Sequence, residues 1–119
     1  MNKKEPRLYH KHLWDFDKKE FIGNFEEMYA NEEKEGYESW HLLDMNTTKS
    51  LISRTLLSQY NFKSVLDVGC GKGSFTQLLS RKNNEVIGVD ISKTAIEKAK
   101  IGFPYIEVHT LKATEIASL

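Results

Sequence analysis

The sequence predicts an open α/β fold built around a parallel sheet. Residues 63–110 alternate between short apolar segments and amphipathic segments in the order strand, helix, strand, helix, strand, as in sheets whose strands are joined by crossover helices. The predicted strands at 63–68 and 85–90 are apolar at both odd and even positions, so we expect both faces of the sheet to be covered. A glycine-rich turn follows the first strand, at the end of the sheet where ligands bind in open α/β folds.

The first 45 residues differ in composition from the rest, since they are polar, acidic and rich in aromatic side chains. We therefore divide the chain into a helical, aromatic segment at 1–45 and a second region at 46–119 that contains the predicted sheet. Apolar residues at helical spacing predict a helix from Asp17 to Glu35, with the stripe Phe21, Ile22, Phe25, Met28 and Tyr29. Tyr37 and Trp40 then lie in an aromatic connection that either closes over a ligand or packs as a loop, and the sequence favours packing.

Three helices are predicted in the second region. The first is capped by Asn46 or Thr47 and runs to Tyr60. The others span 74–82 and 92–100, and the last strand spans 105–110. The side chains expected on the apolar faces of these helices are Leu51, Ile52, Thr55 and Leu56, then Phe75, Leu78 and Leu79, and then Ala95, Ile96 and Ala99, with Ser92 as the cap of the third helix.

Composition excludes several classes of protein. The 119 residues carry 17 basic and 17 acidic side chains, so a neutral chain without a basic stripe is not expected to bind nucleic acid. Cys70 is the single cysteine, which excludes an internal disulfide and favours a reducing, cytoplasmic location. No stretch approaches the roughly 20 apolar residues of a membrane helix.

The chemistry of the chain is concentrated in two motifs. Residues 65–73 read VLDVGCGKG, where the glycines allow a sharp turn and a close approach of ligand to the main chain. Residues 86–90 read VIGVD, and Asp90, 21 residues after Gly69, can accept hydrogen bonds from both hydroxyls of a ribose. The pair indicates an adenosine-like ligand. A P-loop is excluded because Gly73 follows Lys72 where serine or threonine is required.

Residues 66–73 resemble motif I of class I S-adenosylmethionine-dependent methyltransferases, and residues 86–92 resemble motif II. The resemblance covers about residues 46–110 and implies a Rossmann-like fold with S-adenosylmethionine as cofactor. Implied cofactor-binding residues are Asp67 near the methionine end, Gly69, Cys70 and Gly71 beneath the amino-acid half and ribose, Gly73 at the start of the following helix, Asp90 on the ribose, and Ile91 on the adenine face. Lys112 departs from the pattern, because family members often have an acid there that binds the adenine amino group.

Methyl transfer of this kind requires no catalytic triad or metal, and the sequence predicts neither. The reactive methyl group is carried by the sulfonium of the cofactor, so the protein mainly orients a nucleophile. The four histidines lack ligand spacing with the cysteine. We expect His10 and His12 to be solvated, and His41 is the one candidate base. Cys70 is expected to be a small loop residue and not a nucleophile.

Class I methyltransferases usually have a seven-stranded sheet, whereas this sequence ends soon after the third predicted strand. We therefore expect a truncated half of the fold, in which the first strand is an open edge that a missing C-terminal half or a second copy in a homodimer covers. The expected activity is methyl transfer to a small-molecule acceptor, with Tyr37 and Trp40 as possible lid contacts. The alternatives are an NAD-type dinucleotide-binding domain and a non-catalytic methyltransferase-like module.

Overall fold

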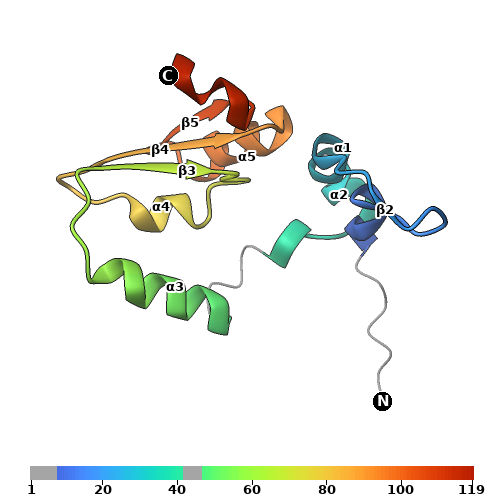
Figure 1. Ribbon diagram of the computed structural model, residues 1–119, viewed down its shortest axis with the longest axis horizontal. Helices are drawn as coiled ribbons and strands as arrows, with labels where there is room; N and C mark the ends of the chain where they lie inside the picture. The colour runs from blue at the N-terminus through green and yellow to red at the C-terminus, as the bar shows by residue number, and fades with distance from the viewer. Residues whose placement is uncertain (1–7, 42–46) are drawn as a thin grey trace.

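The computed structural model describes residues 8–41 and 47–119, and its principal feature is a parallel sheet with the strand order β3-β4-β5. The three strands are β3 (Ser64–Val68), β4 (Glu85–Asp90) and β5 (Glu107–Thr110). Both connections are crossovers, through α4 (Thr76–Leu79) and α5 (Lys93–Gly102). This confirms the predicted α/β fold and its strand-helix alternation (Figure 1).

The bounds of β4 are as predicted, whereas β3 begins one residue later and β5 two residues later than expected. The helix α5 begins as predicted and ends two residues later than expected, at Gly102. The Ser92 hydroxyl accepts a hydrogen bond from the Ala95 amide and caps the helix, and Ala95, Ile96 and Ala99 are buried. Ile96 and Ala99 pack with Ile106 and Val108 of the β5 segment, and this cluster is the core of the domain.

The helix α4 is much shorter than predicted, because it covers four residues and not the nine of 74–82. Residue Thr76 is its fully buried side chain, whereas Phe75, Leu78 and Leu79 are only half-buried. The helix α3 (Thr48–Ser58) is close to its predicted bounds, and the Thr47 hydroxyl caps it by accepting from the Ser50 amide. The alternative cap, Asn46, lies outside the described residues, as does the predicted boundary between the two regions.

One face of the edge strand is open, contrary to the expectation of cover on both faces. Leu66 is 42% exposed and Val68 is 52% exposed. The apolar face of α3 is exposed as well, at Leu51, Ile52 and Leu56. The predicted open edge is confirmed, since β3 pairs with β4 alone in the described sheet. Uncovered apolar side chains along an unpaired strand are a typical association surface.

The N-terminal segment begins with the short helix η1 (Leu8–His12) and a small hairpin, so the predicted helix from Asp17 is wrong in its first half. The hairpin pairs β1 (Trp14–Asp15) with β2 (Glu20–Phe21). The Asp15 carboxylate accepts from the amides of Asp17 and Lys18, and this local bonding stabilises a turn in place of a helix. Phe21 is exposed, although the periodicity placed it on the buried stripe.

After the hairpin, α-helical structure begins at Phe25. The remaining N-terminal elements are α1 (Phe25–Ala30), α2 (Glu32–Glu35) and η2 (Ser39–His41). Met28 and Tyr29 of α1 pack with Tyr9, Leu13 and Ala95, which joins this segment to α5. The segment lies beside the carboxyl ends of the parallel strands (Figure 1).

His12 is buried in the N-terminal segment and not solvated as expected. Its two ring nitrogens lie 3.9 Å from a carboxylate oxygen of Glu27 and 3.7 Å from one of Glu35.

In the described ranges, no helix is both long and apolar enough to cross a membrane.

Candidate functional site

The glycine turn after β3 has the backbone conformation that its sequence predicts. Gly69 and Gly71 have φ of +77° and +55°, which side-chain-bearing residues rarely adopt. The amides of Gly69 and Cys70 both donate to the Val89 carbonyl, at 2.8 and 3.0 Å, and these bonds hold the turn against the end of β4. A Cβ built on Gly69 would meet nothing within 4 Å, so the space above this residue is open to a ligand.

Asp90 ends β4 and points toward the glycine turn. One carboxylate oxygen accepts from the Gly71 amide at 2.9 Å, and the other accepts from the Ser92 amide at 2.9 Å. The side chain is buried. Because each carboxylate oxygen can accept more than one hydrogen bond, these two bonds orient the group and leave acceptor capacity for ligand hydroxyls.

Asp67 lies on β3 below the turn and is also partly buried. The Thr76 hydroxyl donates to its carboxylate at 2.7 Å. Burial raises the pKa of Asp67, the Thr76 hydrogen bond opposes that rise, and the nearby charge of Asp90 adds to it. The two carboxylates therefore make the site acidic, which suits a cationic ligand.

Cys70 is buried within the turn, and its environment disfavours the thiolate. Burial and the charges of Asp90 and Asp67 raise the pKa of this thiol to about 12. Gly88 lies directly behind it, since a Cβ built there would come within 3.0 Å of the Cys70 Sγ. This supports the expectation that Cys70 is a small loop residue and not a nucleophile.

A cavity of about 570 Å³ lies over the turn and brings the predicted residues together. It is lined by six of the seven predicted cofactor-binding residues: Asp67, Gly69, Cys70, Gly71, Asp90 and Ile91. Gly73 does not line it. That residue is buried with φ of +79°, and a Cβ there would lie 2.9 Å from Ile106 Cδ1, so Gly73 lets the loop pack against the β5 segment.

Three aromatic side chains of the N-terminal segment complete the wall of this cavity, namely Phe25, Tyr29 and Trp40. The sequence singled out Trp40 for this position, but it placed Phe25 and Tyr29 only on a packing stripe. Tyr37 is packed as favoured, because its hydroxyl donates to the Met28 carbonyl at 2.5 Å and it does not line the cavity. Its pKa is raised to about 12 by burial and by the charges of Glu35 and Glu32.

The segment after β5 lies at the cavity through Leu111 and Ala113, but Lys112 does not line it. The Lys112 amide instead donates to the Glu115 carboxylate at the start of η3 (Ala113–Ser118). Lys49 of α3 also lines the cavity, and no local pattern in the sequence marked it. No cluster of three or more potential metal ligands occurs within residues 8–41 and 47–119.

This arrangement of a parallel sheet, a glycine turn and a carboxylate at the next strand end defines a Rossmann-like nucleoside-binding fold. Comparison with known proteins specifies the class. Residues 61–113 match a family model described as a methyltransferase domain. This match and the fold confirm the resemblance to class I S-adenosylmethionine-dependent methyltransferases.

Individual relatives match over part of their length. A ubiquinone biosynthesis O-methyltransferase from Alkalilimnicola ehrlichii is 39% identical over 46 residues, which is 39% of this chain and 19% of that protein. The plantazolicin methyltransferase BamL, solved with a triazolic desmethylPZN analog and SAH, is 25% identical with a TM-score of 0.50, over 76% of this chain and 34% of that one. BpumL, solved with a monoazolic analog and SAH, has 19% identity and a TM-score of 0.50, over 71% of this chain and 38% of that one, and supports the fold alone.

Proposed function

We propose that this chain provides the cofactor-binding part of an S-adenosylmethionine-dependent methyltransferase. The chain spans about a fifth of the curated relative and a third of BamL, so the activity is a proposal for the protein as a whole. The observation that carries it is the Asp90 carboxylate, held 2.9 Å from the Gly71 amide beside the open space above Gly69. A ribose placed there would meet the Asp90 carboxylate as a hydrogen-bond acceptor and could approach the backbone of the glycine turn closely.

The residues present fit such a cofactor. Asp90 is oriented to accept from the ribose hydroxyls, and the turn at 69–71 leaves room for the amino-acid half. Ile91 and Leu111 supply apolar surface for the adenine ring, with no acidic partner for its amino group at Lys112. The partly buried Asp67 and the buried Asp90 favour a positive charge near the turn.

When bound, the cofactor would supply an electrophilic methyl group on its sulfonium, and the sulfur would keep the electron pair of the broken bond when an acceptor takes that methyl group. The chain's own contribution is positioning. Asp90 and the glycine turn would hold the cofactor, and Tyr29 and Trp40 add aromatic surface to the lining of the cavity.

We further propose a small molecule as the methyl acceptor, with Trp40 as a contact to it. The cavity of about 570 Å³ has the size of small-ligand sites, and BamL is solved with a triazolic desmethylPZN analog. We also propose that either a C-terminal half of the domain or a second copy covers the open face at Leu66 and Val68, which is the association surface described above.

Calorimetric titration of the chain with S-adenosylhomocysteine and, separately, with NAD tests the proposal. Both ligands contain a ribose that Asp90 and the turn could bind, so discrimination between them depends on the rest of the cavity. We expect S-adenosylhomocysteine to bind and NAD not to bind. Stronger binding of NAD would favour a dinucleotide domain, and binding of neither would contradict the proposal.

A further inference from the structure

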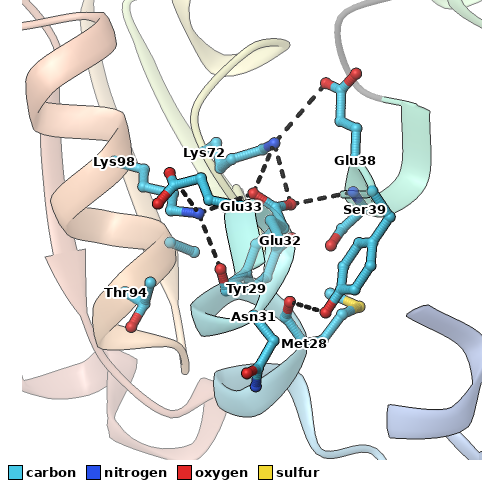
Figure 2. Close-up of polar contacts among 12 residues, drawn as sticks. Met28, Tyr29, Asn31, Glu32, Glu33, Glu38, Ser39, Lys72, Thr94 and Lys98 are labelled. Carbon is cyan, nitrogen blue, oxygen red and sulfur yellow. Dashed lines mark hydrogen bonds and ion pairs between the residues drawn. The ribbon is translucent and has the colours of Figure 1, made fainter. Parts of the chain in front are cut away.

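A buried carboxylate is at the centre of the contacts that attach the N-terminal segment to the glycine turn, where Lys72 also lies 3.8 Å from a carboxylate oxygen of the half-buried Glu38. Glu32 of α2 is 5% exposed, and it is the acid at the centre of the contacts drawn in Figure 2. One of its oxygens accepts from the Ser39 amide at 3.0 Å and lies 3.1 Å from Lys72 Nζ. The other lies 2.9 Å from Lys98 Nζ and 3.2 Å from Lys72 Nζ. These four contacts occupy the acceptor positions of the carboxylate.

The partners of Glu32 lie on three separate parts of the fold. Lys72 is inside the glycine motif, between Gly71 and Gly73. Lys98 is on α5, and its Nζ also donates to the Tyr29 carbonyl at 2.9 Å. Ser39 directly precedes Trp40. The Glu32 side chain thus links the glycine turn to Ser39, the residue before Trp40 of the cavity wall (Figure 2).

Trp40 needs such a fixed attachment, because its backbone has φ of +62°. Residues other than glycine rarely adopt this conformation, and they keep it only where neighbouring contacts hold it. The Ser39 amide, anchored on Glu32, is the contact immediately before it. A second attachment lies at the other end of the segment, where Glu26 accepts from the hydroxyls of Ser92 and Thr94.

We propose that Glu32 is a positioning residue for the proposed cofactor site, which couples the conformation of the glycine turn to the placement of Trp40. The inference rests on the proposed function for its effect on binding, but not for the coupling itself. Without the Glu32 carboxylate, Lys72 loses its closest partner and the turn it belongs to loosens, while the backbone at 39–40 loses its anchor.

Glu32→Gln is the sharpest test, since the amide is isosteric and its NH₂ group cannot accept from either lysine. Glu33→Gln is the matched control, because Glu33 is the neighbouring acid, its side chain is 88% exposed, and its one ion pair within the described ranges is with Lys98, at 3.5 Å. Hydrogen exchange of both variants without ligand measures the coupling. We expect the amides at 39–41 and 70–73 to exchange at least about tenfold faster in Glu32→Gln, with β4 and α5 unchanged.

Fluorescence and binding supply the second readout. In a Trp14→Phe background the emission of Trp40 should shift to the red in Glu32→Gln but not in Glu33→Gln, and the dissociation constant for S-adenosylhomocysteine should rise about tenfold, the loss expected for a charged hydrogen bond. If Glu32→Gln does not fold, Lys72→Gln removes the same link from the turn and should show the same paired change at 39–41.

The outcomes separate the two proposals. Faster exchange at only one of the two segments, or uniform loss of protection across β4 and α5, would overturn the coupling. Paired local changes in a chain that binds no S-adenosylhomocysteine would support the coupling and contradict the proposed function.

Discussion

The carboxylate of Asp90 offers the most informative substitution in the site. In the wild type, the Gly71 and Ser92 amides each lie 2.9 Å from a different oxygen of Asp90. Asp90→Asn keeps the shape of the side chain but leaves one oxygen acceptor, which cannot accept from both amides. A hydrogen bond to a charged acceptor contributes about 1.5–3 kcal/mol, and a buried amide left without a partner costs a similar amount. We therefore expect the free energy of unfolding to fall by about 2 kcal/mol.

The same substitution should weaken nucleoside binding separately from its effect on stability. Loss of the charged acceptor for ribose hydroxyls should raise the dissociation constant for S-adenosylhomocysteine by about 10–100-fold, since 1.4 kcal/mol corresponds to a factor of ten. Thermal unfolding without ligand and calorimetric titration at a temperature where the variant is folded measure the two effects. Asp17→Asn, in the exposed turn of the hairpin, is the control. Wild-type affinity and an unchanged Tm in Asp90→Asn would refute the assignment of this residue.

Three further predictions follow from the same contacts. Gly69→Ala should lower the free energy of unfolding by about 1–2 kcal/mol, because φ is +77°. Its added methyl group should also block ligand entry into the open space above the turn, and a crystal structure of the variant with bound nucleoside would contradict that second expectation. Cys70 should react with iodoacetamide at pH 8 far more slowly than free cysteine, since its pKa is raised to about 12, and labelling at the free rate would argue against the buried turn. Burial alone would raise the pKa of Glu32, but the hydrogen bonds from Lys98, Ser39 and Lys72 lower it. The stabilisation from this carboxylate is therefore present above the ordinary carboxyl pKa and is lost as pH falls through the lowered value. Acid denaturation of Glu32→Gln should lack this pH-dependent loss of stability.

The parts of the fold predicted best from sequence are those set by local pattern. The bounds of β4 and the Ser92 cap depend on a continuous apolar run and on a serine before a helix, and both are confirmed. The motifs also predicted that Asp90 would face the glycine turn, because parallel strands end at the same edge of the sheet. That expectation is confirmed by the 2.9 Å contact to Gly71.

A local side-chain turn and long-range packing explain what the sequence did not predict. The Asp15 carboxylate stabilised a turn at 17–18 within a segment whose apolar spacing also fitted a helix. Glu32 looked like one of several surface acids on α2, and its burial depends on Lys72 and Lys98, which are 40 and 66 residues away in the chain. Lys49 likewise reaches the cavity only through the placement of α3.

The central claim is that the glycine turn and Asp90 together hold the nucleoside of a methyl donor. A crystal of the chain soaked with S-adenosylhomocysteine tests it most directly. We expect density for the nucleoside above residues 69–71, with both ribose hydroxyls within hydrogen-bonding distance of the Asp90 carboxylate. A nucleoside bound elsewhere on the chain, with the Asp90 carboxylate contacting only the Gly71 and Ser92 amides, would contradict the account.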